Sequence, residues 1–283
     1  MKKVTALFFA TCIFFTAYAD TFIVTSNADS GPGSLREAIT LANANGTDAT
    51  DDIRFNIADI SIAGRTILLL TSFPDLTSNI VIDGSTQPGI KIGVSDATIR
   101  ISNPEGVTVN YVFRIMGQKN IGIYGLHLHH IKGTYDLFGV MNVIQLRNVE
   151  NIAIGDTGRG NYFTDLEVAV GMAQVQVAGY GMITGFSFKS NIVNLTEDGT
   201  AIYPGKFGHA ISLTNVRNLE IGGELPGQGN YMSGGNEIML FIHTDTLADI
   251  NTGYLKILNN KFGCNYAQTK ALKCGTIALQ NSR

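Results

Sequence analysis

Carboxylates and imidazoles are the side chains of this chain that could do acid–base or metal chemistry, and their spacing decides whether they gather. Five aspartates fall in turns that would lie on one side of a stack of strands: Asp156, Asp165, Asp198, Asp245 and Asp249. Glycoside hydrolases need two carboxylates across one sugar bond, and polysaccharide lyases combine acidic calcium ligands with a basic residue. Turn carboxylates are usually only solvated, so these five predict no catalytic site by themselves. Calcium at these turns stays an open alternative, and no other cofactor is indicated.

Two histidines spaced two residues apart are the next candidates. His127 and His129 alternate with Leu126 and Leu128, and successive side chains of a strand point to opposite faces. With the leucines inward, both imidazoles would share the outer face, where they could bind a metal or stack on a sugar; exposed polar positions are the more ordinary interpretation. His209, in a Gly-His-Ala segment, only faintly resembles the Gly-His-Gly of polygalacturonase-type enzymes, whose other signatures are missing.

Tyrosines recur along the chain and favour two interpretations. They could form a sugar-stacking surface, or they could form aromatic ladders inside a stack of strands. The residues concerned are Tyr111, Tyr124, Tyr135, Tyr162, Tyr180 and Tyr231.

Composition indicates what kind of scaffold must position these groups. Of 283 residues, 32 are Gly, 45% are hydrophobic and only 15% are charged. High Gly with low charge is typical of a turn-dense, β-rich chain that can bury a sizeable core. The net charge of −3 argues against a nucleic-acid partner.

The first 19 residues read as a signal peptide. Lys2 and Lys3 precede an apolar run from Val4 to Ala17, and Ala17-Tyr18-Ala19 is a small-x-small cleavage site. The run is too short for a membrane anchor, and no later segment is apolar enough to cross a membrane. We therefore expect a secreted or cell-surface protein.

A capping segment, residues 20–64, follows the signal peptide. It begins with a strand at 21–25, and Ser34 and Glu37 then form a capping box. In that box Ser34 accepts from the backbone of Glu37, and Glu37 reaches back to the Ser34 amide. Apolar residues at helical spacing predict one short amphipathic helix to about Ala44, the only helix expected.

Residues 65–283 contain a repeat. Residues 144–155 (IQLRNVENIAIG) align with residues 211–222 (ISLTNVRNLEIG), and an earlier copy at residues 113–124 (FRIMGQKNIGIY) keeps the same apolar pattern. Each copy holds two short strands that cannot form a core alone, so the copies must stack. The offset between the two aligned copies suggests three coils of about 22 residues each, and about ten coils in all.

Two cysteines remain once Cys12 leaves with the signal peptide. Cys264 and Cys274 are an even pair in a compartment where disulfides persist, and they would close one surface loop. Two unrelated thiols are the alternative.

Residues 25–39 (TSNADSGPGSLREAI), residues 82–89 (IDGSTQPG) and the Asn-x-x-Ile-x-Ile-Gly copies resemble the exported right-handed parallel β-helix surface proteins of bacteria that open with an SLREA-type segment. The resemblance spans nearly all of the chain after the signal peptide. It implies an all-β, right-handed parallel β-helix whose N-terminal segment caps the open end. Some relatives carry Cys before this segment; Gly33 stands there, so any role of that thiol is absent.

Two function classes follow from these features. The preferred one is a non-catalytic, adhesin-like surface protein that binds a carbohydrate or a cell-surface partner; the alternative is a polysaccharide lyase or glycoside hydrolase on the same fold, since fold alone does not decide function. Residues 276–283 match the first part of a repeat copy, so Ile277 and Leu279 would lie on an exposed edge. We expect either further chain or a partner to cover that edge. If further chain covers it, this chain is a fragment of a larger protein.

Overall fold

The computed structural model of the chain describes residues 19–133, 142–165, 167–168, 175–204, 209–244 and 253–281. The expected signal peptide lies outside the described residues except for its last position. Tyr135, Asp245 and Asp249 lie outside them as well.

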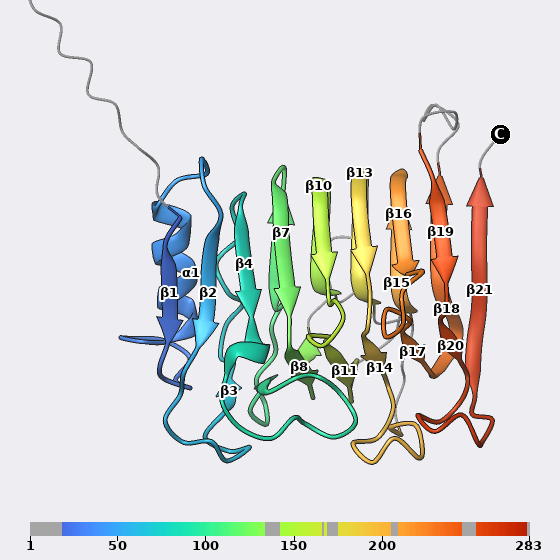
Figure 1. Cartoon of the computed structure of the whole chain (residues 1–283), viewed down its shortest axis with the longest axis horizontal. Coiled ribbons are helices and arrows are strands. Elements are labelled where there is room, and N and C mark those ends of the chain that lie inside the picture. The colour runs from blue at the N-terminus through green and yellow to red at the C-terminus, as the bar shows by residue number, and fades with distance from the viewer. Residues whose placement is uncertain are drawn as a thin grey trace, which may run out of the picture.

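The described strands form a right-handed parallel β-helix, in which each strand pairs in parallel with a strand of the next coil (Figure 1). This confirms the fold class expected from the repeats. The longer sheet has 12 strands. They are β1 (Thr21–Val24), β2 (Asp51–Phe55), β4 (Ile80–Asp83), β6 (Phe113–Met116), β7 (Lys119–Tyr124), β10 (Asn142–Ile154), β13 (Val175–Phe188), β15 (His209–Thr214), β16 (Val216–Gly222), β18 (Gly234–Thr244), β19 (Leu255–Leu258) and β21 (Cys274–Asn281).

A shorter sheet of seven strands forms the opposite wall. Its strands are β3 (Thr66–Leu68), β5 (Ile99–Ser102), β8 (Leu126–His129), β11 (Tyr162–Thr164), β14 (Ile192–Val193), β17 (Tyr231–Met232) and β20 (Lys261–Phe262). A two-stranded sheet joins β9 (Lys132–Gly133) and β12 (Glu167–Val168). Because each coil supplies one strand to the shorter sheet, these strands mark about seven coils, fewer than the ten expected.

The strand register also corrects the expected coil length. Ile144 pairs with Val177, and Val177 pairs with Ile211. The two aligned repeat copies, which begin at Ile144 and Ile211, therefore lie two coils apart, not three. The earlier copy lies one coil before the copy that begins at Ile144, since its first residue, Phe113, pairs directly with Ile144. Each coil is longer than expected because long loops connect its strands.

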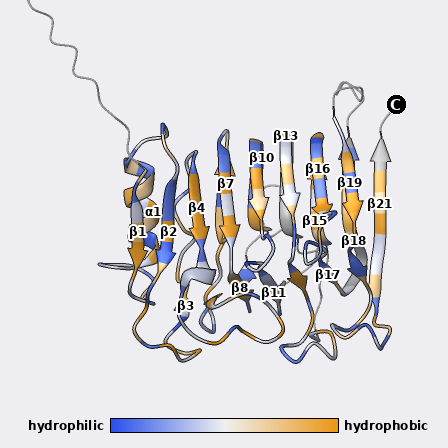
Figure 2. Cartoon of the chain, in the orientation of Figure 1, coloured by the Kyte–Doolittle hydropathy of each residue, from blue (hydrophilic) through white to orange (hydrophobic). Residues whose placement is uncertain are grey.

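Ladders of apolar side chains fill the space between the sheets. Ile82, Ile123, Ile154 and Phe188 occupy matching positions of four successive coils, and each is fully buried. Apolar residues recur along the strands of the longer sheet, as the hydropathy colouring shows (Figure 2). Alternation of period two thus places one face of every strand in a continuous core.

A ladder of asparagines runs along the corner before the shorter sheet. The amide nitrogen of Asn161 donates to Asn191 Oδ1 over 3.1 Å, Asn191 donates to Asn230 over 3.2 Å, and Asn230 donates to Asn260 over 2.7 Å. Each Nδ2 also donates to a backbone carbonyl at the end of a strand. The asparagine side chains therefore provide hydrogen-bond partners for backbone groups at the corner, where pairing between strands is interrupted.

The N-terminal helix α1 (Leu35–Ala44) begins where the capping box predicts. Ser34 accepts from the Glu37 amide over 3.2 Å, as expected. The return contact differs by one residue, because Glu37 Oε2 accepts from the Gly33 amide over 2.6 Å and the Ser34 amide donates to Gly31 instead. Leu35, Ile39 and Ala42 bury the apolar face of the helix. Among the described residues, no helix is long and apolar enough to span a bilayer.

The two cysteines do not form the expected disulfide in the structure. Cys264 and Cys274 are both free thiols, and each is partly buried. They lie in a loop in which the backbones of Cys264 and Ala271 form an antiparallel β-bridge. Burial raises the pKa of both thiols. Backbone pairing, rather than a covalent bond, holds the loop in this structure.

The last strand of the longer sheet carries exposed apolar side chains. Ile277 is 41% exposed and Leu279 is 52% exposed on β21. The cover expected for this edge stays a prediction.

Candidate functional site

The outer face of the shorter sheet carries a group of hydrogen-bonded polar side chains. Two loops lie over this face: the crossing loop, residues 87–98, and the 194–203 loop. Ile92 and Ala97 of the crossing loop and Leu195 of the second loop pack with Tyr162 and Ile192, which point outward from the sheet. Side chains that a single strand would leave in solvent are therefore covered.

His127 lies at the centre of this covered face. The sequence places it correctly on the outer side of β8, but the expectation that it is exposed is wrong, since it is completely buried. Its ring stacks on Tyr162 with 4.4 Å between centroids. Loops from distant parts of the chain bury it, which the alternation of one strand cannot reveal.

The hydrogen bonds of His127 determine where its proton lies. Arg100 Nε donates to His127 Nδ1 over 3.2 Å, so this nitrogen must carry a lone pair. The ring is then neutral with its proton on Nε2, which donates to Thr164 Oγ1 over 2.6 Å. The Thr164 hydroxyl can donate its own proton to His129 Nδ1, 2.9 Å away. Arg100, His127, Thr164 and His129 thus form one directed chain of hydrogen bonds.

The 194–203 loop completes this polar cluster. Its Glu197 carboxylate forms an ion pair with Arg100, across 97 residues of sequence. Tyr162 donates its hydroxyl to the Leu195 carbonyl over 2.7 Å. Tyr203 lies against His129 with 5.8 Å between ring centroids. We use "polar cluster" below for Arg100, His127, His129, Thr164 and Glu197.

Both histidines of the cluster resist protonation. Burial, reinforced by the Arg100 charge, lowers the pKa of His127 well below its usual value. The same two causes lower the pKa of His129 to about 4. Burial also raises the pKa of Tyr162 and of Tyr203. The cluster is therefore built around neutral imidazoles and neutral phenols.

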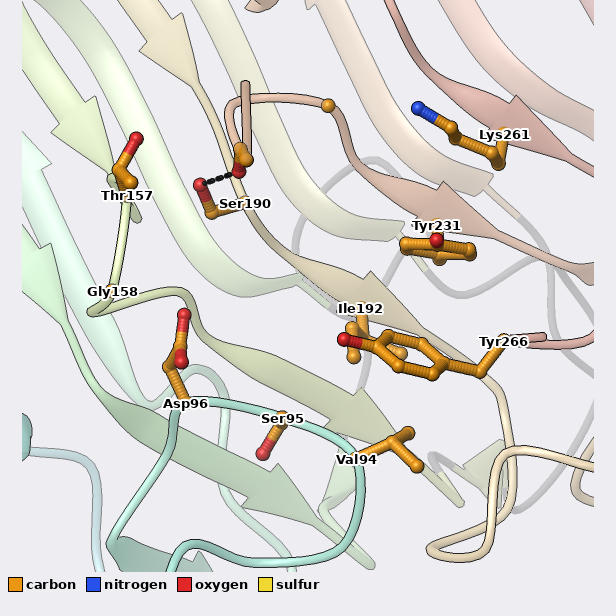
Figure 3. A pocket seen from close by; sticks show the side chains of 12 residues that line it. Val94, Ser95, Asp96, Thr157, Gly158, Ser190, Ile192, Tyr231, Lys261 and Tyr266 are labelled. Carbon is orange, nitrogen blue, oxygen red and sulfur yellow. Dashed lines mark hydrogen bonds between the residues drawn. The ribbon is translucent and has the colours of Figure 1, made fainter. Parts of the chain in front are cut away.

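A pocket of about 280 Å³ opens beside the cluster (Figure 3). Tyr231 and Tyr266 form one wall, with 4.7 Å between their ring centroids and a 35° angle between the rings. Asp96 lies on the opposite side. Twelve residues line the pocket: Val94, Ser95, Asp96, Thr157, Gly158, Ser190, Ile192, Gly227, Gly229, Tyr231, Lys261 and Tyr266. We call it the tyrosine pocket.

The polar groups of the pocket are fixed by their neighbours. Asp96 pairs with Lys91 and accepts from the Gly160 amide over 3.3 Å. Tyr231 accepts from Gln268 over 3.1 Å, and Lys261 donates to the Asn259 carbonyl over 2.7 Å. A pocket with an aromatic wall and a few oriented polar groups is typical of a small-ligand site.

The structure separates several groups that the sequence suggested together. Tyr231 lines the tyrosine pocket, whereas Tyr162 is buried beside the polar cluster, so the tyrosines form no single surface. Asp165 accepts from His130 Nδ1 over 2.8 Å, and Asp156 pairs with Arg159. Asp198 accepts from Thr196 and Thr200 within its own loop. Within the described ranges, no group of three or more His, Cys, Asp or Glu side chains could hold a metal ion.

Sequence reasoning missed Arg100, Glu197, Asp96, Lys261 and Tyr266. Each is an ordinary polar residue in a loop or at an outward strand position, and no motif marks it. The repeat did contain a usable signal for Lys261, because Gly160-Asn161-Tyr162, Gly229-Asn230-Tyr231 and Asn259-Asn260-Lys261 occupy equivalent corners. The outward position after the ladder asparagine is therefore the position that builds the outer face.

Comparison with known proteins identifies no family for this chain. No protein-family model matches the chain, and no curated protein matches it. Among solved structures, rice weevil pectin methyl esterase aligns over 96% of this chain and 90% of its own, with 12% sequence identity and a TM-score of 0.29. Similarity at this level assigns neither a family nor an activity.

Proposed function

We propose that this chain is an exported, non-catalytic β-helix protein of the cell surface that binds carbohydrate in the tyrosine pocket. The single observation that supports this most directly is the Tyr231–Tyr266 wall, which faces the Asp96 carboxylate across the pocket. Aromatic faces stack on the C–H faces of sugar rings, while carboxylates accept from vicinal hydroxyls. The pocket offers both kinds of contact.

The composition of the pocket favours binding over hydrolysis. Glycoside hydrolysis requires two carboxylates across the scissile bond. Asp96 is the single carboxylate among the described residues that line the pocket, and it is already paired with Lys91. We therefore propose that the pocket binds sugar without cleaving it. The binding experiment below also detects cleavage.

Removal of one tyrosine ring tests the proposal. Tyr266 is 41% exposed, so Tyr266→Ala should fold normally. The wild-type chain is first screened on an array of neutral and acidic oligosaccharides, and the strongest binder is then titrated by calorimetry. We expect Tyr266→Ala to weaken binding about tenfold, since one aromatic contact contributes about 1.4 kcal/mol.

Tyr254→Ala is the matched control. Tyr254 is 50% exposed, precedes β19, and lies outside the lining of the tyrosine pocket. Equal affinity losses in the two variants, or no binding by the wild type, would contradict the proposal. Release of shortened or unsaturated products from the array sugars would replace it with the enzyme class.

Export is tested separately from binding. The proposed cleavage after Ala19 predicts a secreted product that begins at Asp20. Intact mass of the protein recovered from the culture medium checks this directly.

A further inference from the structure

We propose that the 194–203 loop is an acid-released strap: protonation of the histidines beneath it detaches the loop from the shorter sheet and removes one support of the tyrosine pocket. Its link to ligand binding rests on the proposed function, whereas the release of the loop does not. Three features of the structure carry the proposal: the side-chain contacts that hold the loop, the neutral state that those contacts require, and the connection of the loop to the pocket.

The strap moves as a unit because its internal bonds are self-contained. The Thr196 amide donates to the Ala201 carbonyl over 2.8 Å, and the Tyr203 amide donates to the Asn194 carbonyl over 3.2 Å. Asp198 accepts from the Thr200 amide over 3.0 Å and from two hydroxyls of the same loop. Release at the sheet therefore leaves the turn itself intact.

Three polar or ring contacts between described side chains and the strap hold it to the sheet. They are the Glu197–Arg100 ion pair, the Tyr162–Leu195 hydrogen bond and the Tyr203–His129 ring contact. Arg100 and His129 belong to the directed hydrogen-bond chain, and Tyr162 stacks on His127. The state of the histidines therefore decides whether Arg100 and His129 stay in place.

Protonation breaks the directed chain at identifiable atoms. A proton on His127 Nδ1 would face the Arg100 Nε–H, so that donor would meet donor. A proton on His129 Nδ1 would reverse the direction of its bond to Thr164, whose hydroxyl would then accept from both imidazoles and turn its own proton away from the chain. Each event also places a second positive charge beside Arg100 in a buried site.

The charges around the cluster do not compensate for these added protons. Arg65, buried at the start of β3, adds a further positive charge close to Arg100. The groups that face the two histidines from the neighbouring elements are Arg100, His130, Tyr162, Asp165, Glu197 and Tyr203. Arg65 acts on Arg100, and Asp198 acts on Tyr162. Glu197 is the carboxylate that touches Arg100. Protonation of the histidines therefore adds positive charge to a site that already holds Arg100, with Arg65 close by.

The direction of the pH effect follows from linkage. The open strap lets His129 take up a proton near its ordinary pKa of about 6.5, whereas the closed strap holds that pKa at about 4. Between these values the open form binds protons that the closed form does not. Falling pH in this window shifts the population toward the open strap.

The strap is connected to the pocket through Gly199. The Tyr266 amide donates to the Gly199 carbonyl over 2.9 Å. A Cβ at Gly199 would lie 2.7 Å from Tyr266 Cβ and 3.0 Å from Val94 Cγ1, so the glycine backbone packs directly on two residues that line the pocket. Release of the strap removes this support from the tyrosine wall.

The absence of Trp from the chain allows a clean reporter. Tyr203→Trp places one tryptophan on His129, and its emission and its quenching by acrylamide are followed from pH 8 to pH 3.5 in the full chain. Far-ultraviolet circular dichroism is recorded on the same samples. We expect a red shift and increased quenching with a midpoint between pH 4 and 6.5, while the β signal is unchanged.

Three further variants in the Tyr203→Trp background identify the groups responsible. His129→Gln should remove most of the transition in this window, whereas His130→Gln, one residue along the chain, should leave it in place. Glu197→Gln, which weakens the ion pair, should move the midpoint to higher pH. Fluorescence that changes only when the β signal collapses, or equal effects of His129→Gln and His130→Gln, would overturn the proposal.

The outcomes for the strap and for the pocket are distinguishable. The oligosaccharide array is repeated at pH 7.5 and pH 5 with the wild-type chain. If the strap is released but no sugar binds at either pH, the proposed function is overturned and the proposal of an acid-released strap is supported. Binding of equal strength at both pH values, with no tryptophan transition, would overturn the strap and leave the proposed function.

Discussion

Arg100 donates from its Nε to Nδ1 of His127 over 3.2 Å, and this contact fixes a fully buried histidine in its neutral form. An arginine rarely makes such a contact, because it places a permanent cation against an imidazole. Here the Glu197 carboxylate balances the arginine from the other side. The pair is thus part of a network whose stability depends on sequence positions far apart.

The first prediction concerns the stability that His127 provides. His127→Ala should lower the free energy of unfolding by about 3 kcal/mol, because it leaves a cavity and two hydrogen-bonding groups without their partner. His127→Phe keeps a ring against Tyr162 and should lose less, about 1–2 kcal/mol. Urea denaturation at pH 7.5 measures both. His130→Ala, at the partly exposed neighbour, should change stability by no more than about 0.5 kcal/mol; a similar loss in all three would refute the assignment.

The second prediction concerns the pH dependence of global stability. The folded state holds the pKa of His129 at about 4 and that of His127 well below its usual value. Well above pH 6.5 both histidines are neutral in the folded and unfolded chains, so they cause no pH dependence there. As the pH falls below 6.5, the unfolded chain takes up protons first and stability decreases. Urea midpoints should therefore fall from pH 7 to pH 4.5, and His129→Gln should flatten part of this decrease.

The third prediction concerns the asparagine ladder. Asn191 Oδ1 accepts from the Asn161 amide over 2.9 Å, and its Nδ2 donates to the Ile154 carbonyl over 2.8 Å. Asn191→Leu should lower the free energy of unfolding by about 3 kcal/mol, because buried backbone groups lose their partners. Asn56→Leu changes an exposed asparagine in the same chemical way and should have little effect. Equal losses in thermal denaturation would show that the ladder is not the cause.

The fourth prediction concerns the thiols. Burial raises the pKa of Cys264 and of Cys274, and the thiolate is the reactive form. Maleimide at pH 7.5 should therefore label both residues of the native chain more slowly than it labels them after denaturation. Intact mass before and after reduction decides between two thiols and the disulfide that the sequence suggested: two labels without reduction confirm the thiols, and none would indicate the bridge.

The helix, the repeat and the inward side chains were predictable from local patterns. Ser34 and Glu37 mark the start of α1 because capping is a contact between near neighbours in sequence. The coil length was not predictable in the same way. The self-similarity of the copies at 144–155 and 211–222 fits either two or three coils, and only the pairing of Ile144 with Val177 decides for two.

The sequence by itself determined that this chain must stack, because strands that alternate apolar and polar residues bury one face only against copies of themselves. It also determined that His127 points away from the core. The tertiary structure alone decided that this outward histidine is buried, since loops from residues 87–98 and 194–203 close over it. A period of two specifies the side of a strand on which a residue lies. It carries no information on which distant loop covers that side. The contact of Arg100 with Glu197, 97 residues away, forms only because the 194–203 loop folds over the sheet.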